Sequence, residues 1–275
     1  MADEATHTPM RCLSTLAYRA YKLARYLERP GLFALRQRGV VVDDYLKLTQ
    51  PWLRTLAVRT VLDIGANTGQ FAALAQAAFP EAQIYSFEPL PECFQRLQAN
   101  LANAGRFRAF NVGLGREAGT LTFQRNAFTA SSSFRRMTDT HKREFPLTKQ
   151  TTDVRVRVER LDDLAPQLAL REPLFVKIDV QGYEDEVLAG GEQTIRRAAL
   201  VLAETSFETL YEGQPLFNDI HRTLVGWGFT YAGSLDQIYS PHDGRPLQAD
   251  SLFIRREESG RARVAQGNIK QILHY

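Results

Sequence analysis

The segment spanning residues 61–71 constrains the fold of this chain more than any other. Its sequence, Val-Leu-Asp-Ile-Gly-Ala-Asn-Thr-Gly-Gln-Phe, combines an apolar run, a glycine-bearing turn and the first turn of a helix. Gly65 and Gly69 allow the backbone to approach a ligand closely, and Asn67 is one of the few non-glycine residues that tolerate a left-handed conformation. The helix start adds unpaired N–H groups and a positive dipole end. This pattern predicts a strand, a ligand-binding turn and a helix of an α/β fold.

A second strand-like run, residues 82–87, leads directly to an acidic residue, Glu88. Nucleotide-binding folds place a carboxylate at roughly this offset from the glycine turn, where it accepts hydrogen bonds from the two ribose hydroxyls. The two segments together predict a mononucleotide-binding half. The residues expected to bind the cofactor here are Asp63, Gly65, Ala66, Asn67, Gly69, Phe87, Glu88 and Pro89.

The charge of the turn indicates which nucleotide it binds. Its spacing is Gly-x-Asn-x-Gly rather than Gly-x-Gly-x-x-Gly, and Asp63 stands two residues before the first glycine. A carboxylate there repels a pyrophosphate and attracts an amino group. S-adenosylmethionine carries an adenosine, an ammonium and a sulfonium but no phosphate, so it fits both Asp63 and Glu88 and is the expected cofactor. The alternatives are a nucleotide-dependent oxidoreductase, which Asp63 disfavours, and a non-catalytic binding or interaction protein on the same fold.

Composition limits the class of protein and its partners. A chain of 275 residues, 44% apolar and 24% charged, is typical of a globular α/β domain with at most a small appendage. A net charge of +3 is too small to indicate nucleic-acid binding. The N-terminus lacks the features of a signal peptide, and no run approaches the roughly 20 apolar residues of a membrane span. A cytoplasmic location is therefore expected. Cys12 and Cys93 have no metal-ligand spacing.

The chain divides into three predicted parts. Residues 1–56 are helix-rich and mildly basic, with apolar residues at helical spacing over residues 13–27 and a second expected helix over residues 45–53. This extension is expected to cap the sheet or the cofactor cleft, and a membrane-surface or homodimer role for its basic helix is the alternative. Residues 57–256 hold the α/β domain, and residues 257–275 form a charged tail.

Further strands and one insertion are expected inside the α/β domain. Residues 107–112 form the third strand, with Asn111 and Val112 at the carboxyl end, where an adenine ring is expected; Asn111 is equally explained as a turn residue. Residues 116–160 break the alternation of strands and helices and predict a lid or a substrate loop, with a plain solvated loop as the alternative. The strands expected to complete the sheet are residues 229–232, 237–240 and 251–254, with a hairpin-like turn at 241–244.

Two more strand ends carry acids. Leu174–Ile178 has the length of a buried parallel strand and is followed by Asp179, and residues 199–203 lead to Glu204. The carboxyl edge of an open α/β sheet is where ligands bind. Asp179 is therefore expected to anchor the amino acid moiety of the cofactor, orient the acceptor or hold a cation.

These residues taken together resemble the FkbM-type S-adenosylmethionine-dependent methyltransferases. The segments that carry the resemblance are residues 63–69, 87–89, 131–133, 177–184, 206–217 and 250–253. The resemblance implies a Rossmann-like class I methyltransferase domain over residues 57–256, with a seven-stranded, mostly parallel sheet flanked by helices. The N-terminal helical cap, expected from the helical spacing of residues 1–56, lies outside the resemblance. It also implies methyl transfer to a hydroxyl oxygen of a sugar, a polyketide or another small metabolite.

The chemistry implied by the resemblance gives the acids their expected roles. Methyl transfer is an in-line displacement in which the protein aligns the reactants and excludes water. Because an alcohol has a high pKa, a base is expected to remove its proton as the bond forms. Asp179 is the first candidate for this base or for an acceptor-orienting group, followed by Glu204 and His221. A divalent cation held by Asp179, Glu204 and Asp250 is the alternative, but the spacing does not support a metal site, so no metal is expected.

Overall fold

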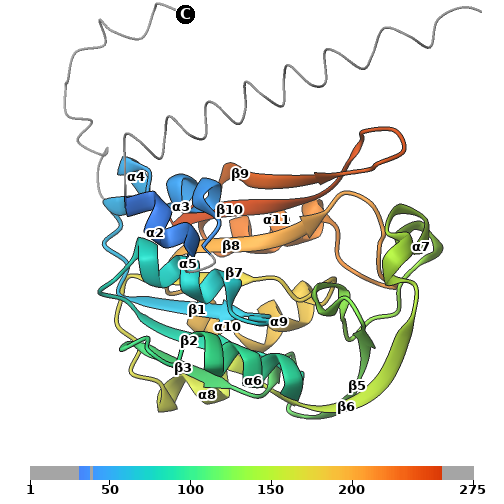
Figure 1. The fold of residues 1–275 in the computed structure, drawn as a ribbon, viewed down its shortest axis with the longest axis horizontal. Coiled ribbons are helices and arrows are strands. Elements are labelled where there is room, and N and C mark those ends of the chain that lie inside the picture. Colours follow the sequence, from blue (N-terminus) through green and yellow to red (C-terminus); the bar gives the residue numbers. More distant parts are fainter. Residues whose placement is uncertain (1–30, 38–39, 256–275) are drawn as a thin grey trace, which may run out of the picture.

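The computed structural model of the protein describes residues 31–37 and 40–255 (Figure 1). At its centre lies a seven-stranded sheet with the order β3-β2-β1-β7-β8-β10-β9. Its strands are β1 Thr60–Ile64, β2 Gln83–Phe87, β3 Phe107–Phe110, β7 Leu174–Ile178, β8 Ala198–Ser206, β9 Phe229–Tyr239 and β10 Pro246–Arg255. The first five strands in this order, β3, β2, β1, β7 and β8, pair in parallel, whereas β10 is antiparallel to both of its neighbours, β8 and β9. The expected seven-stranded, mostly parallel sheet is confirmed.

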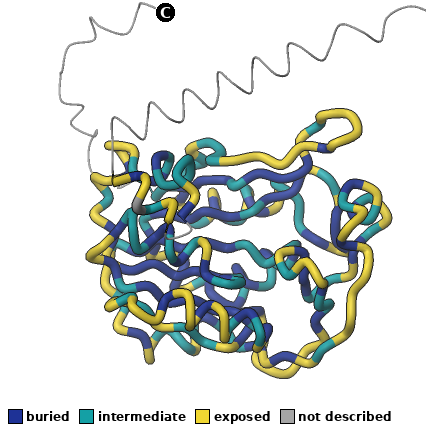
Figure 2. Tube along the Cα trace, in the orientation of Figure 1, coloured by how far each residue is buried: buried dark blue, intermediate teal, exposed yellow. Residues whose placement is uncertain are grey.

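Alternating side chains of the central strands build a core on each face of the sheet. Val61 packs into one core and Leu62 into the other. The first face is covered by α2 Gly31–Gln37, α3 Val42–Leu48, α4 Pro51–Arg54, α5 Gln70–Ala78 and α6 Pro91–Asn100. The second face is covered by α8 Leu161–Leu164, α9 Glu184–Gly190, α10 Glu192–Ile195 and α11 Phe217–Gly226. Because helices cover both faces, β1 and β7 are buried at every position (Figure 2).

The N-terminal extension is described from residue 31 onward. Two short helices, α3 and α4, replace the single helix expected over residues 45–53, because Pro51 lacks an N–H and starts α4 at its first position. The helix expected over residues 13–27 and the tail at 257–275 lie outside the described residues. None of the helices in the described part of the chain has the length and apolar character needed to span a bilayer.

The end of the sheet differs from the sequence-based expectation. The prediction of separate strands at residues 229–232 and 237–240 is wrong, because both belong to the single strand β9. Register shifts between β9 and β10 mark bulges, which let the pairing continue past Gly233. The turn at residues 241–244 is confirmed and joins β9 to β10. The third strand ends at Phe110, earlier than expected.

The insertion forms a second, three-stranded sheet with the order β4-β6-β5. Its elements are β4 Gly113–Leu114, β5 Gly119–Asn126, η1 Thr129–Ser131, α7 Asp139–Glu144, η2 Pro146–Thr148 and β6 Thr151–Glu159, and a further short turn, η3 Ala165–Gln167, follows α8. Met137 forms a bridge with Tyr211, and the Thr138 N–H donates to the Leu210 carbonyl over 2.9 Å. The insertion is thereby held against the segment that follows β8.

Candidate active site

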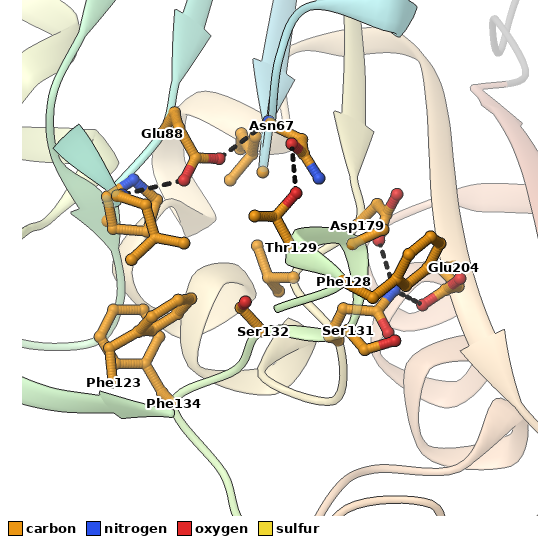
Figure 3. A pocket seen from close by; sticks show the side chains of 18 of the residues that line it. Asn67, Glu88, Phe123, Phe128, Thr129, Ser131, Ser132, Phe134, Asp179 and Glu204 are labelled. Carbon is orange, nitrogen blue, oxygen red and sulfur yellow. Dashed lines mark hydrogen bonds between the residues drawn. The ribbon is translucent and has the colours of Figure 1, made fainter. Parts of the chain in front are cut away.

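Two cavities lie at the carboxyl ends of the parallel strands, which is the ligand-binding edge of such a sheet. The large cavity, seen from close by in Figure 3, has a volume of about 370 Å³, and the small cavity has a volume of about 240 Å³. The residues that line both are Gly65, Asn67, Ala130, Asp179 and Glu204. The turns after β1 and β7 and the carboxyl-terminal end of β8 therefore meet η1 of the insertion at one place.

The glycine turn after β1 adopts the conformation that its sequence predicts. Gly65 has a φ of 77° and Asn67 a φ of 48°, so both lie in the left-handed region. A Cβ added to Gly65 would lie 1.8 Å from the carbonyl oxygen of Asp179. The backbone of this turn is therefore packed directly against the turn that follows β7, and the Gly65 N–H is bonded to the carbonyl of Phe87 over 3.1 Å.

Glu88 holds the glycine turn and faces the large cavity (Figure 3). Its Oε2 accepts the Asn67 N–H over 2.8 Å and its Oε1 accepts the Leu90 N–H over 2.9 Å. The residue is only 6% exposed, and this burial raises the pKa of its carboxyl to about 7, against the lowering effect of the two hydrogen bonds. Each carboxylate oxygen keeps a lone pair for a further donor.

Asp63 lies behind the turn and lines neither cavity. Its side chain is fully buried, with Oδ2 accepting from the Ser86 hydroxyl over 3.0 Å and Oδ1 lying 3.5 Å from the Lys177 ammonium. Lys177 also donates to the Gly65 carbonyl over 2.8 Å and lies 3.4 Å from Asp179 Oδ2. The structure thus places this predicted cofactor ligand one layer below the cavity wall, where it faces a buried lysine.

The electrostatics of this buried group follow from its position. Burial raises the pKa of the Asp63 carboxyl, and the Lys177 ammonium partly opposes that rise. Burial alone would lower the pKa of Lys177, but the carboxylates of Asp179 and Asp63 outweigh it and raise this pKa above its ordinary value. Lys177 is therefore a fixed positive charge beneath the turn.

Asp179 and Glu204 are joined through Gln181 (Figure 3). The Gln181 side-chain Nε2 donates to Asp179 Oδ1 over 2.9 Å and to Glu204 Oε2 over 2.6 Å. The Tyr211 hydroxyl donates to Gln181 Oε1 over 2.9 Å, which fixes the orientation of the amide. Burial and the neighbouring Asp179 charge raise the pKa of Glu204 well above its ordinary value and favour its protonated form, whereas Asp179 faces Lys177.

The other candidates near the glycine turn divide between the cavities and the core. Phe87 and Pro89 line the large cavity, and Ala66 lines the small one. Gly69 lines neither, and a Cβ added there would lie 2.7 Å from a methyl group of Leu97. Gly69 therefore allows α5 to pack against α6.

The structure does not bring Asn111 and Val112 to either cavity wall. Asn111 donates from its side-chain amide to the carbonyls of Glu88 and Pro89 over 2.9 and 3.0 Å, and Val112 is buried in the core. Because the third strand ends early, the cavity wall at this position is formed instead by residues 113–114. Asn111 thus supports the loop that carries Glu88.

His221 and Asp250 occupy different surroundings. The His221 ring lies in an aromatic cluster on α11, 5.5 Å from the Phe217 ring and 6.2 Å from the Phe253 ring, and the residue lines neither cavity. Asp250 lines the small cavity together with Asp179 and Glu204. Among the described residues, however, no group of three or more His, Cys, Asp or Glu side chains is arranged to hold a metal ion.

Several cavity residues of the insertion were not predicted from the sequence. The Thr129 hydroxyl donates to Asn67 Oδ1 over 3.1 Å, so the insertion contacts the glycine turn directly (Figure 3). Ser131 and Ser132 line the same cavity, and the resemblance to the family at these positions is the signal that marks them. His141, on α7, also lines it, but its mixed polar and basic segment gave no signal.

Comparison with known proteins places these features in a family. A protein-family model described as "Methyltransferase FkbM domain" matches residues 63–231. The chain is 31% identical over 161 residues to the 2-O-methyltransferase NoeI of Sinorhizobium fredii, covering 56% of this chain and 66% of NoeI. It is 28% identical to the hexuronic acid methyltransferase AglP of Haloferax volcanii, covering 52% of this chain and 54% of AglP. The chain thus spans less than two thirds of the length of these two relatives.

Two further similarities have broader coverage. The 31-O-demethyl-FK506 methyltransferase FkbM of Streptomyces tacrolimicus is 27% identical over 207 residues, which is 66% of this chain and 76% of that protein. The crystal structure of methyltransferase FkbM from Methylobacillus flagellatus is 14% identical and covers 85% of this chain and 60% of that one, with a TM-score of 0.46. Since the family model matches more than half of the chain and includes the glycine turn, Glu88 and Asp179, the chain belongs to the FkbM methyltransferase family.

Proposed function

We propose that this protein transfers a methyl group from S-adenosylmethionine to a hydroxyl oxygen of a small-molecule, sugar or polyketide-type acceptor. The observation that carries the proposal is the Glu88 carboxylate, which holds the glycine turn from one side and faces the large cavity with its remaining lone pairs. A carboxylate in this place has the chemistry needed to accept two ribose hydroxyls.

The residues around the large cavity fit S-adenosylmethionine. A volume of about 370 Å³ lies within the range of small-molecule sites. Glu88 would hold the ribose, and Phe87, Pro89 and residues 113–114 would enclose the adenine with apolar surface. Asp179, which borders both cavities, would attract the ammonium of the methionine moiety. Asp63 would support this arrangement from below through Lys177 rather than by contact.

S-adenosylmethionine, when bound, would supply the methyl group: the new carbon–oxygen bond would replace the carbon–sulfur bond, whose electron pair would pass to sulfur, and the acceptor oxygen would release one proton. The protein's own contribution is to align the two reactants and to exclude water. Asp179 and Glu204, locked together by Gln181, would orient the acceptor hydroxyl at the junction of the two cavities.

The acceptor class rests on the relatives and on the charge of the chain. Two relatives are named for methylation of an oxygen position or of a hexuronic acid, and a net charge of +3 gives no support for a nucleic-acid acceptor. The cytoplasmic location, the homodimer role of the basic N-terminal helix and the three-part division of the chain stay predictions.

Calorimetric titration with S-adenosylhomocysteine, NAD and NADP tests the proposal. We expect binding of S-adenosylhomocysteine alone, and a strong loss of that binding in Glu88→Ala. Binding of a dinucleotide instead would favour an oxidoreductase. Binding of S-adenosylhomocysteine without methylation of any hydroxyl-bearing acceptor would favour a non-catalytic binding protein.

The affinity for S-adenosylhomocysteine is expected to rise with pH through about 7, the pKa of Glu88. A raised carboxyl pKa means that the folded protein holds the Glu88 proton up to this pH, and the protonated carboxyl accepts hydrogen bonds less well. If only the ionised form binds, the dissociation constant is about tenfold higher at pH 6 than at pH 8. Titration calorimetry across this range measures the effect.

Glu184 provides a matched control for this pH dependence. Burial also raises its pKa to about 7, and it accepts the backbone N–H groups of Val180 and Gly182, but it lines neither cavity. Glu88→Gln is therefore expected to bind weakly and without pH dependence, whereas Glu184→Gln keeps the pH dependence of the unaltered protein. If Glu88→Gln keeps the pH dependence and Glu184→Gln loses it, Glu88 does not contact the ligand.

A further inference from the structure

His141 is a buried side chain of the large cavity that the proposed function leaves without a role. It lies on α7, is 2% exposed and lines the cavity. Its ring lies 5.0 Å from the Tyr211 ring and 5.1 Å from the Phe145 ring. The insertion thus carries an imidazole to the cavity wall and holds it between two aromatic rings.

The hydrogen bonds of Thr148 determine which ring nitrogen of His141 carries the proton. The Thr148 hydroxyl has a single proton, and it donates that proton to the Phe145 carbonyl over 2.8 Å. The contact of 3.4 Å between Thr148 Oγ1 and His141 Nδ1 is then a hydrogen bond only if Nδ1–H is the donor. In the neutral ring, Nε2 consequently bears a free lone pair.

That lone pair has no partner within the described part of the chain. No described residue forms a hydrogen bond with His141 Nε2. The fully buried side-chain nitrogen and oxygen atoms without a partner among the described residues are Asp63 Oδ1, Arg245 Nε and Arg255 Nη2. Since His141 Nε2 is not one of them, it keeps some exposed surface, and the residue to which it belongs lines the large cavity.

The imidazole is connected to the acids through two side chains and is electrically neutral. Tyr211 packs its ring against His141 and donates its hydroxyl to Gln181, which in turn bonds Asp179 and Glu204. A single side chain therefore separates His141 from the Gln181 amide. Burial lowers the pKa of His141 to about 4, so the lone pair is available throughout the physiological pH range.

We propose that His141 Nε2 binds the acceptor hydroxyl and receives its proton during methyl transfer. This inference rests on the proposed function. As the carbon–oxygen bond forms, the acceptor oxygen becomes strongly acidic, so even a weakly basic imidazole can take its proton. The proton passes from the oxygen to Nε2, gives a transient imidazolium and then leaves to solvent.

This assignment changes the role expected for Asp179. Its carboxylate already lies 3.4 Å from the Lys177 ammonium and accepts a hydrogen bond from Gln181, so both of its oxygens are engaged by the protein. Asp179 orients the reactants, whereas His141 supplies the free lone pair.

Long-range ¹H–¹⁵N NMR at pH 7 tests the tautomer without any acceptor. The His141 resonances are assigned by their loss in His141→Gln. We expect a protonated Nδ1 and an unprotonated Nε2, whether or not S-adenosylhomocysteine is bound. A protonated Nε2, or an imidazolium at pH 7, would overturn the proposal.

Substitution tests the transfer step itself. His141→Phe keeps the aromatic packing and removes both nitrogens. With methyl glycosides of hexoses, 6-deoxyhexoses and hexuronic acids as probes, we expect kcat to fall about 100-fold or more. His141→Gln, whose carbonyl can accept the same hydrogen bond, should recover the KM for the acceptor but not the full kcat. Retention of kcat by His141→Phe would overturn the proposal.

His221→Phe is the matched comparison, because this histidine also lies among aromatic rings but away from both cavities. It is expected to keep the kcat of the unaltered protein. Binding of S-adenosylhomocysteine distinguishes failure of the proposed function from failure of the role of His141. If the unaltered protein does not bind S-adenosylhomocysteine, the proposed function is refuted. Unchanged binding in His141→Phe with unchanged kcat refutes only the role of His141.

Discussion

Replacing Gly65 with alanine is expected to destabilise the protein by about 4 kcal/mol or more and to abolish binding of S-adenosylhomocysteine. The added Cβ would lie 1.8 Å from the Asp179 carbonyl oxygen, a backbone atom that cannot rotate away. To relieve this contact the turns after β1 and β7 must separate, which opens the wall shared by the two cavities. Urea denaturation and titration calorimetry measure the two effects.

Gly244 separates this steric clash from the conformational cost of alanine. Its φ of 76° matches the 77° of Gly65, but no heavy atom of the described residues lies within 4 Å of a Cβ added there. Gly244→Ala is therefore expected to cost only about 1–2 kcal/mol, the price of a left-handed alanine. Equal losses in the two variants would mean that the close approach of the turns contributes nothing.

The Lys177→Met variant is expected to lose about 3–5 kcal/mol of unfolding free energy. Lys177 is buried, and its removal leaves the fully buried Asp63 with the Ser86 hydroxyl as its one side-chain partner in the described part of the chain. The Gly65 carbonyl loses its donor in the same step. Denaturant titration of the variant measures this loss.

Two further variants identify the cause of that loss. Lys47 also has two acidic partners, Asp44 at 3.4 Å and Asp236 at 3.7 Å, but its side chain is 35% exposed, so Lys47→Met is expected to cost at most about 1 kcal/mol. Adding Asp63→Asn to Lys177→Met removes the unpaired charge and should restore part of the stability. If the double variant is no more stable than Lys177→Met, the lost free energy of unfolding comes from packing rather than from the unpaired charge of Asp63.

Short, strongly apolar segments made much of the fold predictable. The runs that became β1, β2, β7 and β8 are buried at most positions, and such strands are recognisable because they are short and mainly apolar. The positive φ of Asn67 also followed from its residue type and its place between two glycines. The local sequence was therefore sufficient to predict those segments whose conformation depends mainly on their own residues.

The errors arose where partners distant in the sequence decide the structure. Residues 229–239 look like two strands because Gly233 and its polar neighbours interrupt the apolar pattern, and only pairing with β10 makes them continuous. Asp63 looks like a cofactor ligand until Lys177 is placed beside it. His141 reaches the cavity only because α7 packs against Tyr211.

The position of β10 has a consequence for protein synthesis. Among the strands of residues 31–37 and 40–255, this one is the last to be translated, yet it lies between β8 and β9, and β9 has no other neighbour there. From the completion of β8 to the start of β10 at Pro246, a ribosome adding 5–20 residues per second needs about 2–8 s. Throughout that interval the nascent chain carries an unpaired edge on β8. Such an edge can pair with another chain and start aggregation, and molecular chaperones can prevent this by binding it first.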